Sequence, residues 1–244
     1  MRRVAAALLL ALAVAGCAAA ALAWRRIVLF RDTPYGALEE KVVVVPAGAS
    51  ARGVVHALAG AGALSDEALA WRYVRWVKRD RRPFRAGEYA FAGPLRPDEV
   101  LERVYRGEVK LHRFTVPEGL RADEIAPIVE RSGLASGDEF LQVARDPAVA
   151  RALGLPYPGL EGFLFPDTYA FPRGASARSI AEAMVGRFRE EYARAEATRA
   201  EGVAFTMGEA ATFASIVEKE TGRPDGEKQR LFLMAPPEST ARPS

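Results

Sequence analysis

Two glutamates near the C-terminal end of the chain, Glu218 and Glu220, have the side-chain type that acid–base chemistry requires. They close an apolar run that reads "ATFASIVEKETGRP". A carboxylic acid at an apolar edge, without a nearby cation, has a raised pKa and can protonate a leaving group. The alternative interpretation is a pair of solvated glutamates near a helix end, which is the commoner situation in an arbitrary sequence.

The helix that carries the two glutamates is predicted to run from about Met207 to Thr221. Thr206 and Glu209 have the spacing of a capping box, and Gly222 followed by Pro224 marks the end. At about 100° per residue, an apolar stripe is expected to face the core. The stripe consists of Ala210, Phe213, Ala214 and Val217, and Ile216 widens it.

Helical spacing distinguishes the two glutamates from each other. Glu220 has Arg223 three residues further on, so an ion pair can form between them. Glu218 has no cation at helical contact spacing, and its small neighbours Ala214 and Ala211 leave room for a ligand. Of the two side chains, Glu218 is therefore the better candidate for a general acid.

A second candidate region is the segment "LEGFLFPDTYAFPRG", residues 160–174, which is rich in aromatic residues and prolines. One interpretation is an ordered loop with pieces of edge strand, in which the aromatic side chains fill a core. The other is the wall of a cleft, because aromatic rings pack against sugar faces and acids accept hydrogen bonds from hydroxyl groups. The candidate substrate-binding residues are Glu161, Phe165, Asp167 and Tyr169, together with Glu220 of the predicted helix.

The composition excludes several classes of function. The 244 residues, half of them hydrophobic, allow one medium domain or two small ones, and a net charge of +3 does not argue for nucleic-acid binding. Because Cys17 is the single cysteine, neither an intramolecular disulfide nor a cysteine-based metal site can form. The only histidines, His56 and His112, exclude a metal site built from several histidines.

The N-terminus has the composition of a membrane element. An uncharged run from Val4 to Trp24 lies between two arginine pairs and is about as long as a helix that crosses a bilayer. A cleaved secretory signal is the alternative, and lipidation at Cys17 is a third interpretation. Each of them places the bulk of the chain at a membrane surface outside the cytoplasm.

The residues that follow are expected to form a short linker and then two folded regions. A strand at residues 41–45, two helices that begin at Ser50 and Asp66, a strand at residues 86–93 and a helix at residues 96–107 are predicted in this order. The motif from Val45 to Gly62 is similar to that from Val116 to Gly133, and both predict a strand, a Val-Pro-x-Gly turn and a helix.

Three smaller expectations concern individual segments. Ser136 and Glu139 have the spacing of another capping box, and a long helix is expected from Ser176 to about Arg199. The segment "WVKRDRRPFR", residues 76–85, is interpreted as a solvated loop rather than a nucleic-acid site. Trp71 and Trp76 are expected in the core.

These motifs together resemble the endolytic murein transglycosylases of the YceG-like family. The resemblance is carried by the N-terminal span, "VPEGLRADEIA", "LEGFLFPDTYAFPRG" and "ASIVEKETGRP", in this order. It implies an α+β protein that crosses the bacterial inner membrane once, with its main domain in the periplasm. The implied organisation is an anchor or signal at residues 1–26, a linker at 27–40, a LysM-like subdomain at 41–109, a catalytic domain at 110–225 and an atypical tail at 226–244.

The resemblance also implies a reaction and its partners. The family cleaves peptidoglycan glycan strands between N-acetylmuramic acid and N-acetylglucosamine and leaves 1,6-anhydromuramyl ends. Glu218 corresponds to the catalytic glutamate, and neither a metal nor an organic cofactor is required. The partners would be glycan strands, the membrane and proteins of cell-wall synthesis, and nucleic acid is not among them. A membrane-tethered peptidoglycan-binding module without activity is the alternative.

The sequence departs from the family pattern after "GRPDGEKQR". The family continues with a section that completes the catalytic domain, whereas this chain reads "LFLMAPPESTARPS". The expectation is an incomplete catalytic domain with little or no activity.

Overall fold

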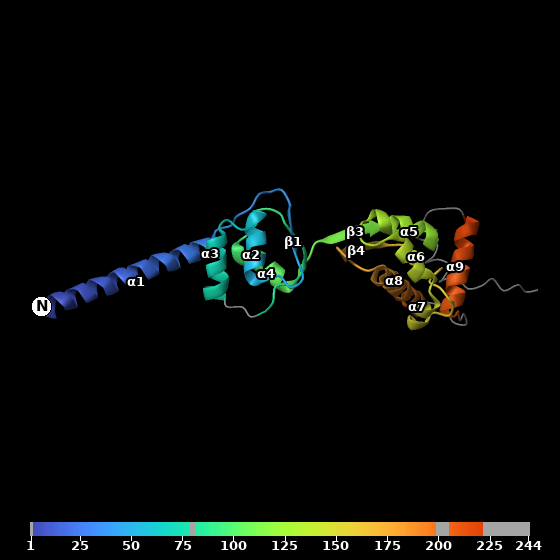
Figure 1. The fold of residues 1–244 in the computed structure, drawn as a ribbon. Coiled ribbons are helices and arrows are strands. Elements are labelled where there is room, and N and C mark those ends of the chain that lie inside the picture. Colours follow the sequence, from blue (N-terminus) through green and yellow to red (C-terminus); the bar gives the residue numbers. More distant parts are fainter. Residues whose placement is uncertain (1, 79–81, 199–204, 222–244) are drawn as a thin grey trace, which may run out of the picture. The chain divides into compact units, whose positions relative to one another are not determined.

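The structure is a computed structural model, and it describes residues 2–78, 82–198 and 205–221. The chain divides into two compact units, Met1–Lys110 and Leu111–Ser244, each of which combines helices with a two-stranded sheet (Figure 1). Side chains are described from residue 7 to residue 216, apart from the gaps.

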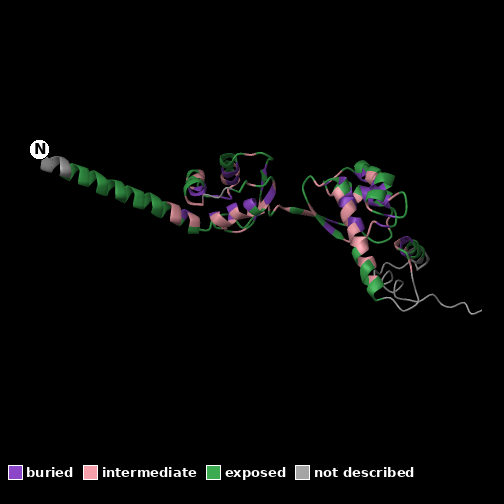
Figure 2. Ribbon diagram, turned by 90° about the horizontal axis from the view of Figure 1, so that it is seen from below, coloured by how far each residue is buried: buried purple, intermediate pink, exposed green. Residues whose placement is uncertain are grey.

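The first unit begins with helix α1 (Arg2–Asp32). Its part from Ala7 to Asp32 is long and apolar enough to cross a membrane, a test that a signal sequence also passes. Residues 7–26 of this part are exposed (Figure 2). The helix continues into the residues expected to form a linker because Ile27 and Phe30 pack into the core of the unit. At its end the hydroxyl of Thr33 donates a hydrogen bond to the carbonyl of Leu29, at 2.6 Å.

The rest of the first unit follows the predicted order of strand, two helices, strand and helix. Strands β1 (Lys41–Val45) and β2 (Gly87–Phe91) pair antiparallel, with Val43 opposite Tyr89. Helices α2 (Ala51–Gly60) and α3 (Glu67–Arg72) lie between them in the chain, α3 continues as the π-helix η1 (Tyr73–Lys78), and α4 (Pro97–Arg106) follows β2.

Helix boundaries in this unit follow the capping residues. The hydroxyl of Ser50 accepts a hydrogen bond from the Gly53 amide, and the carboxylate of Asp66 accepts one from the Leu69 amide. Gly107 ends α4 in the left-handed conformation, with φ of 73°. The predicted helix starts at Ser50 and Asp66 are thereby confirmed.

The interpretation of residues 76–85 as a solvated loop is wrong for its first part, and so is the core placement of Trp76. Residues 76–78 belong to η1, which turns Tyr73 and Val74 toward the core and leaves Trp76 62% exposed. Trp71 packs against the core, as expected.

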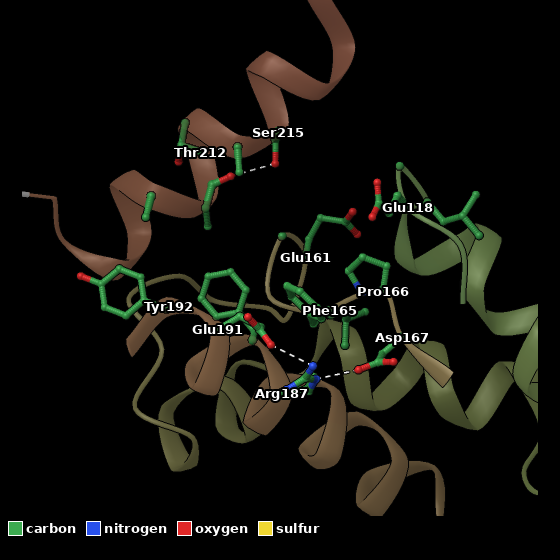
Figure 3. A pocket seen from close by; sticks show the side chains of 18 of the residues that line it. Glu118, Glu161, Phe165, Pro166, Asp167, Arg187, Glu191, Tyr192, Thr212 and Ser215 are labelled. Atoms are coloured by element: carbon green, nitrogen blue, oxygen red, sulfur yellow. Dashed lines mark hydrogen bonds and ion pairs between the residues drawn. The ribbon is translucent and has the colours of Figure 1, made fainter. Parts of the chain in front are cut away.

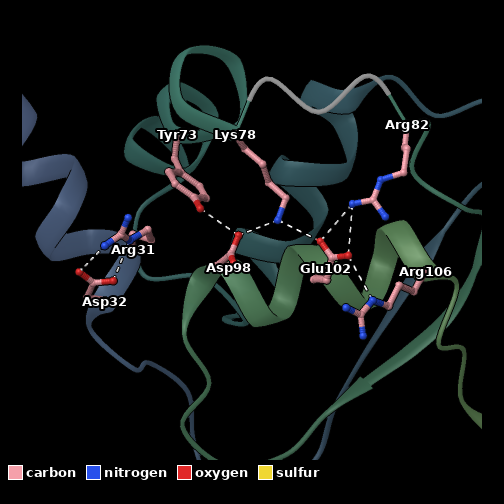
Figure 4. A network of polar contacts seen from close by, with 8 residues as sticks. All are labelled: Arg31, Asp32, Tyr73, Lys78, Arg82, Asp98, Glu102 and Arg106. Atoms are coloured by element: carbon pink, nitrogen blue, oxygen red, sulfur yellow. Dashed lines mark hydrogen bonds and ion pairs between the residues drawn. The ribbon is translucent and has the colours of Figure 1, made fainter.

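A polar network fixes η1 on α4 (Figure 4). The ammonium of Lys78 lies 2.6 Å from Asp98 and 3.1 Å from Glu102, and its side chain is only 12% exposed. The hydroxyl of Tyr73 donates a hydrogen bond to Asp98 at 2.9 Å. The loss of water around Lys78 is thus offset by two carboxylates.

The second unit pairs β3 (Leu111–Thr115) antiparallel with β4 (Thr168–Pro172). Its helices are α5 (Ala122–Arg131), α6 (Gly137–Arg145), α7 (Pro147–Ala152), α8 (Ala177–Ala197) and α9 (Met207–Thr221). Ile180, Met184 and Val185 of α8 are fully buried and form the centre of its core. The long helix predicted from Ser176 is confirmed, with the Ser176 hydroxyl as its cap.

The internal repeat is confirmed in its local structure. β1 and α2 in the first unit correspond to β3 and α5 in the second, and the turn glycines Gly48 and Gly119 have φ of 74° and 81°. The glycines that follow the helices, Gly62 and Gly133, also have positive φ, of 71° and 70°. Positive φ is a conformation that glycine adopts without strain.

The capping box predicted at Ser136 and Glu139 is wrong. Ser136 occupies the N-cap position of α6, but its side chain makes no capping hydrogen bond. Its carbonyl accepts from the Phe140 amide at 3.0 Å instead, so the backbone alone closes the first turn.

Candidate active site

Helix α9, which carries Glu218 and Glu220, begins at the predicted capping box. The carboxylate of Glu209 accepts a hydrogen bond from the Thr206 amide at 2.8 Å, and the Glu209 amide donates to the Thr206 hydroxyl at 3.3 Å. These reciprocal bonds satisfy two of the amides that a helix start leaves without partners. The beginning of the helix is therefore set by its own sequence.

The face that α9 turns toward the unit differs from the prediction. Ala210 and Ala211 are buried, whereas Phe213 and Ile216 are 42% and 52% exposed. Small residues allow close approach here, since a Cβ atom at Gly208 would lie 3.1 Å from both Pro156 Cγ and the Tyr157 hydroxyl. The predicted stripe is confirmed at Ala210 and wrong at Phe213 and Ile216, because contact through glycine and alanine decides the orientation. The side chain of Val217 lies outside the described residues.

A cleft of about 1230 Å³ opens beside this alanine-rich face (Figure 3). One wall is α9, with Ala211, Ala214 and Ser215, and another is the C-terminal half of α8. Most of the remaining lining comes from the turns at residues 117–122 and 161–167, which belong to two of the motifs noted in the sequence, and Tyr157 completes it. The cleft lies wholly within the second unit.

The two turns bring acidic side chains to the cleft. In Figure 3 the side chains of Glu118 and Glu161 point into it. The carboxylate of Glu161 accepts a hydrogen bond from the Ala122 amide at 3.2 Å, in the first turn of α5. A helix N-terminus stabilises negative charge, so this contact holds Glu161 at the cleft surface.

Asp167 lines the cleft but is already paired with Arg187 of α8, at 2.6 Å. Partial burial acts to raise the pKa of Asp167, but the hydrogen bonds from Arg187 and from the Thr168 amide outweigh it and hold the pKa below its usual value. Arg187 also pairs with Glu191 at 2.8 Å and lies over the ring of Phe165, 5.8 Å from its centroid. Arg187 therefore joins the loop that carries Phe165 to α8.

Phe165 and Tyr169, the two aromatic candidates, lie in different places. Phe165 lines the cleft, whereas Tyr169 is buried and is not among the lining residues. The Tyr169 hydroxyl donates a hydrogen bond to the Phe165 carbonyl at 2.6 Å, and burial raises its pKa. Tyr169 thus supports the cleft wall from behind.

Glu218 and Glu220 lie in the last turns of α9, and their side chains are outside the described part of the structure. The backbone register places Glu218 three, four and seven residues after Ser215, Ala214 and Ala211, which all line the cleft. Residues at these spacings share one side of a helix. Of the residues four and seven positions before Glu220, Ile216 lines the cleft and Phe213 does not, so the register places Glu220 at the edge of the cleft-lining side.

Comparison with known proteins identifies the family. The model of the YceG-like family matches residues 43–230. The chain belongs to the YceG-like family.

Two curated relatives, from Streptococcus pneumoniae strains D39 and R6, are named endolytic murein transglycosylase. Each is 25% identical over 226 residues, which cover 80% of this chain and 40% of the relative, so the chain spans well under half of their length. A crystal structure of a YceG-like protein from Listeria monocytogenes is 23% identical, covers 78% of this chain and 67% of that chain, and has a TM-score of 0.37.

Several residues that line the cleft of this YceG-like chain were not predicted from the sequence as site residues. They are Glu118, Arg187, Glu191, Tyr192 and Arg194. The spacing of Arg187 and Glu191 was a usable signal, because residues four apart on a helix form ion pairs. Glu118 lies inside the motif "VPEGL", but a single acid in a turn does not indicate a site by itself.

No group of three or more histidine, cysteine, aspartate or glutamate side chains that could hold a metal occurs among the described residues of this YceG-like chain. The described cleft is lined by carboxylates, arginines, hydroxyl groups and aromatic rings.

Proposed function

We propose that this chain is an endolytic lytic transglycosylase of peptidoglycan, which cleaves the bond between N-acetylmuramic acid and N-acetylglucosamine and leaves 1,6-anhydromuramyl ends. Membership of the YceG-like family and the name of the relatives support this proposal. The observation that carries it is the position of Glu218, one helical turn after the α9 residues that line the cleft.

Glu218 is assigned two successive roles. It donates a proton to the glycosidic oxygen as that bond breaks, and then accepts a proton from the C6 hydroxyl of the muramyl residue, which attacks C1. Since the sugar supplies its own nucleophile, the reaction needs no second carboxylate to activate water or to form a covalent intermediate.

The other cleft residues would hold the glycan. The volume of about 1230 Å³ exceeds the roughly 300–1,000 Å³ of typical small-molecule sites, so it suits several sugar rings. Glu118 and Glu161 would accept hydrogen bonds from sugar hydroxyls, and Phe165 would pack against a sugar face. Asp167 would position Arg187 and would not contact the glycan itself. Tyr169 would support the cleft wall through its hydrogen bond to Phe165. Glu220 would be a solvated side chain at the end of the helix.

The proposed location is the bacterial inner membrane, with α1 as a single span and both folded units in the periplasm. The apolar part of α1 supports the anchor. The first unit is proposed as a LysM-like subdomain that holds glycan, because it has two helices between the antiparallel strands β1 and β2. Contact with cell-wall synthesis proteins stays a prediction.

The test is glycan cleavage by the whole chain reconstituted in lipid nanodiscs. Isolated sacculi are incubated with it, and the products are analysed by mass spectrometry for 1,6-anhydromuramyl ends. The Glu218→Gln variant should release none, while the matched Glu220→Gln variant, two residues away on the same helix, should keep most of the activity. Equal product from wild type and Glu218→Gln would refute the assignment.

A second candidate function is a tethered peptidoglycan-binding module without activity. The observation that favours it is that the first unit has its own core and sheet, independent of the cleft. If the wild-type chain sediments with sacculi but releases no anhydro ends, the binding module is supported, and so is the expectation of low activity. The tail on which that expectation rests lies outside the described residues.

A further inference from the structure

An exposed tryptophan lies between arginines on the outer side of α3 and η1. Trp76 is 62% exposed, and the guanidinium of Arg75 lies over its ring, 5.8 Å from the centroid. Arg72, four residues before Trp76, is exposed as well. We call these three residues the Arg-Trp face. Leu38 and Val44 of this unit are also exposed, at 88% and 57%, but Trp76 is the largest of the exposed apolar side chains described in its folded part.

Helix α3, which carries Arg72 and continues as η1 with Arg75 and Trp76, lies at the end of the unit where α1 enters. Figure 1 shows α3 as the outermost helix on that side, and α1 and α3 contact each other directly. The rings of Phe30 in α1 and Tyr73 in η1 are 6.5 Å apart, edge to face. The packing of α3 against α2 lies on the opposite side, away from the apolar part of α1.

The depth of this contact can be derived from helix geometry. Phe30 lies six residues after Trp24, which is about 9 Å along the helix axis. If Trp24 marks the inner edge of the interface, as tryptophans at the ends of spans do, Phe30 and Tyr73 lie about 1–4 Å outside the lipid headgroups, a layer roughly 5–8 Å thick on each side. Long side chains such as those of tryptophan and arginine can reach back into the headgroups from there. The Arg-Trp face lies within one turn of Tyr73.

The orientation of the face is fixed by packing. Phe30 is 6% exposed inside the core, and α1 continues without a break from its apolar part to this residue. Lys78 at the end of η1 is held by Asp98 and Glu102 of α4 (Figure 4). The segment therefore has anchored contacts on both sides of Trp76.

We propose that the Arg-Trp face lies on the surface of the membrane that α1 enters and binds the headgroups of anionic phospholipids. Tryptophan favours the interfacial region, and guanidinium groups pair with phosphate through two hydrogen bonds. Arg25 and Arg26, which follow Trp24 in α1, add positive charge at the same level. This proposal rests on the proposed anchor and goes beyond it, since an anchor alone requires no contact between the folded unit and lipid.

The test uses the tryptophans as separate reporters in the whole chain, with one copy in each nanodisc. The variant Trp24→Phe/Trp71→Phe keeps Trp76, and the variant Trp71→Phe/Trp76→Phe keeps Trp24. Fluorescence quenching is measured with lipids spin-labelled at the headgroup, in discs of phosphatidylcholine with and without phosphatidylglycerol. Both tryptophans should be quenched, and the quenching of Trp76 should increase at least twofold with phosphatidylglycerol.

The outcomes separate the two proposals. Quenching of Trp24 without quenching of Trp76 would leave the anchor in place and overturn the lipid contact. Absence of quenching at both positions would overturn the anchor, and the lipid contact with it. Because the single-copy disc excludes a second chain, quenching of Trp76 cannot arise from burial between two copies.

A charge-reversal pair tests the arginines. In the Trp76 reporter, Arg72→Glu/Arg75→Glu should abolish the increase with phosphatidylglycerol. The matched control, Arg52→Glu/Arg113→Glu, reverses two exposed arginines elsewhere and changes the net charge equally. An unchanged response of the first variant, or equal loss in both, would overturn the proposal, and circular dichroism confirms that both variants are folded.

Discussion

At the scale of single residues, the cleft is organised by Arg187. Its guanidinium contacts Asp167 on the loop and Glu190 and Glu191 on its own helix. Such contacts determine the shape of a binding surface without taking part in a reaction. The role proposed for Arg187 can therefore be separated experimentally from that of Glu218.

Replacement of Arg187 by alanine should weaken substrate binding more than the chemical step. Loss of the contacts with Asp167 and Phe165 frees the cleft loop, so the KM for glycan should rise severalfold while kcat changes little. The free energy of unfolding should fall by about 1 kcal/mol, as for a partly exposed ion pair. Steady-state kinetics and urea titration measure the two effects.

The control for this prediction is Arg178→Ala in the same helix. Arg178 pairs with Glu182 at 2.7 Å on an exposed surface outside the cleft. Its loss should leave KM unchanged and cost less than about 0.5 kcal/mol. If both variants raise KM equally, Arg187 has no specific role in the cleft.

At the scale of helices and strands, the sequence predicts where an element begins or ends more reliably than it predicts which face of the element is buried. Thr206, Ser50 and Gly107 act through local hydrogen bonds or local backbone conformation. The few residues next to them in the sequence are therefore enough to predict the helix end. The buried face of α9 could not be read in this way, because several of its positions are alanine. Which side of such a helix is buried depends on distant partners such as Tyr157.

The same distinction applies to the candidate site. The motifs located both turns of the cleft, because their aromatic, proline and acidic residues are unusual together. The positions of Arg187 and Tyr169 relative to Phe165 depend on how α8 and β4 pack, and this is not encoded in local spacing. The exposure of Trp76 was not predicted, because a π-helical turn changes which side of the segment is buried.

The close contact of α9 gives a prediction about Gly208. The Gly208→Ala substitution places a methyl group 3.1 Å from Pro156 and Tyr157, so either α9 or these neighbours must move apart slightly. We expect a loss of about 1–2 kcal/mol in unfolding free energy and a matching loss of glycan cleavage. Gly186→Ala in α8 is the control: no atom lies within 4 Å of the added methyl group, so stability should rise by about 0.5–1 kcal/mol.

The network between η1 and α4 makes the first unit sensitive to acid. Partial burial acts to raise the pKa of Asp98, but hydrogen bonds from Lys78 and Tyr73 outweigh it, and Lys78 also lowers the pKa of Glu102. A carboxyl group whose pKa is lowered in the folded state stabilises the fold at every pH above its ordinary pKa, which is 3.8 for Asp and 4.5 for Glu. This stability is lost as the pH falls through the lower, folded-state pKa.

Lys78→Met should remove most of this acid sensitivity. The variant loses about 1–3 kcal/mol at pH 7, because the carboxylates of α4 lose a nearly buried partner. Its stability should then change less between pH 5 and pH 3 than that of the wild type. Thermal unfolding followed by circular dichroism across this range measures both effects, and parallel pH curves would contradict the prediction.

At the scale of the whole molecule, the chain has two cores without a buried residue in common. The first is closed by Phe30 of α1, and the second is centred on α8. Damage to one core is therefore expected to stay within its own unit.

Phe30→Ala tests this independence. Removal of a buried phenylalanine side chain costs about 3–5 kcal/mol in a well-packed core, so amide hydrogen exchange should accelerate throughout residues 41–106 and stay unchanged in residues 111–198. Leu29→Ala is the matched control, because Leu29 is exposed and its loss should not affect exchange in either unit. Faster exchange in both units would show that they unfold together.

The contact that α9 makes through glycine and alanine determines which of its positions tolerate substitution. A helix that touches its neighbours through its smallest residues has little spare volume at the contact, so position 208 should reject most substitutions, and the buried positions 210 and 211 should accept few. Positions 213 and 216, which are exposed, should accept many. In a saturation mutagenesis library, tolerance along α9 would therefore rise and fall with the helical repeat, and the positions that vary least would be those with the least side chain.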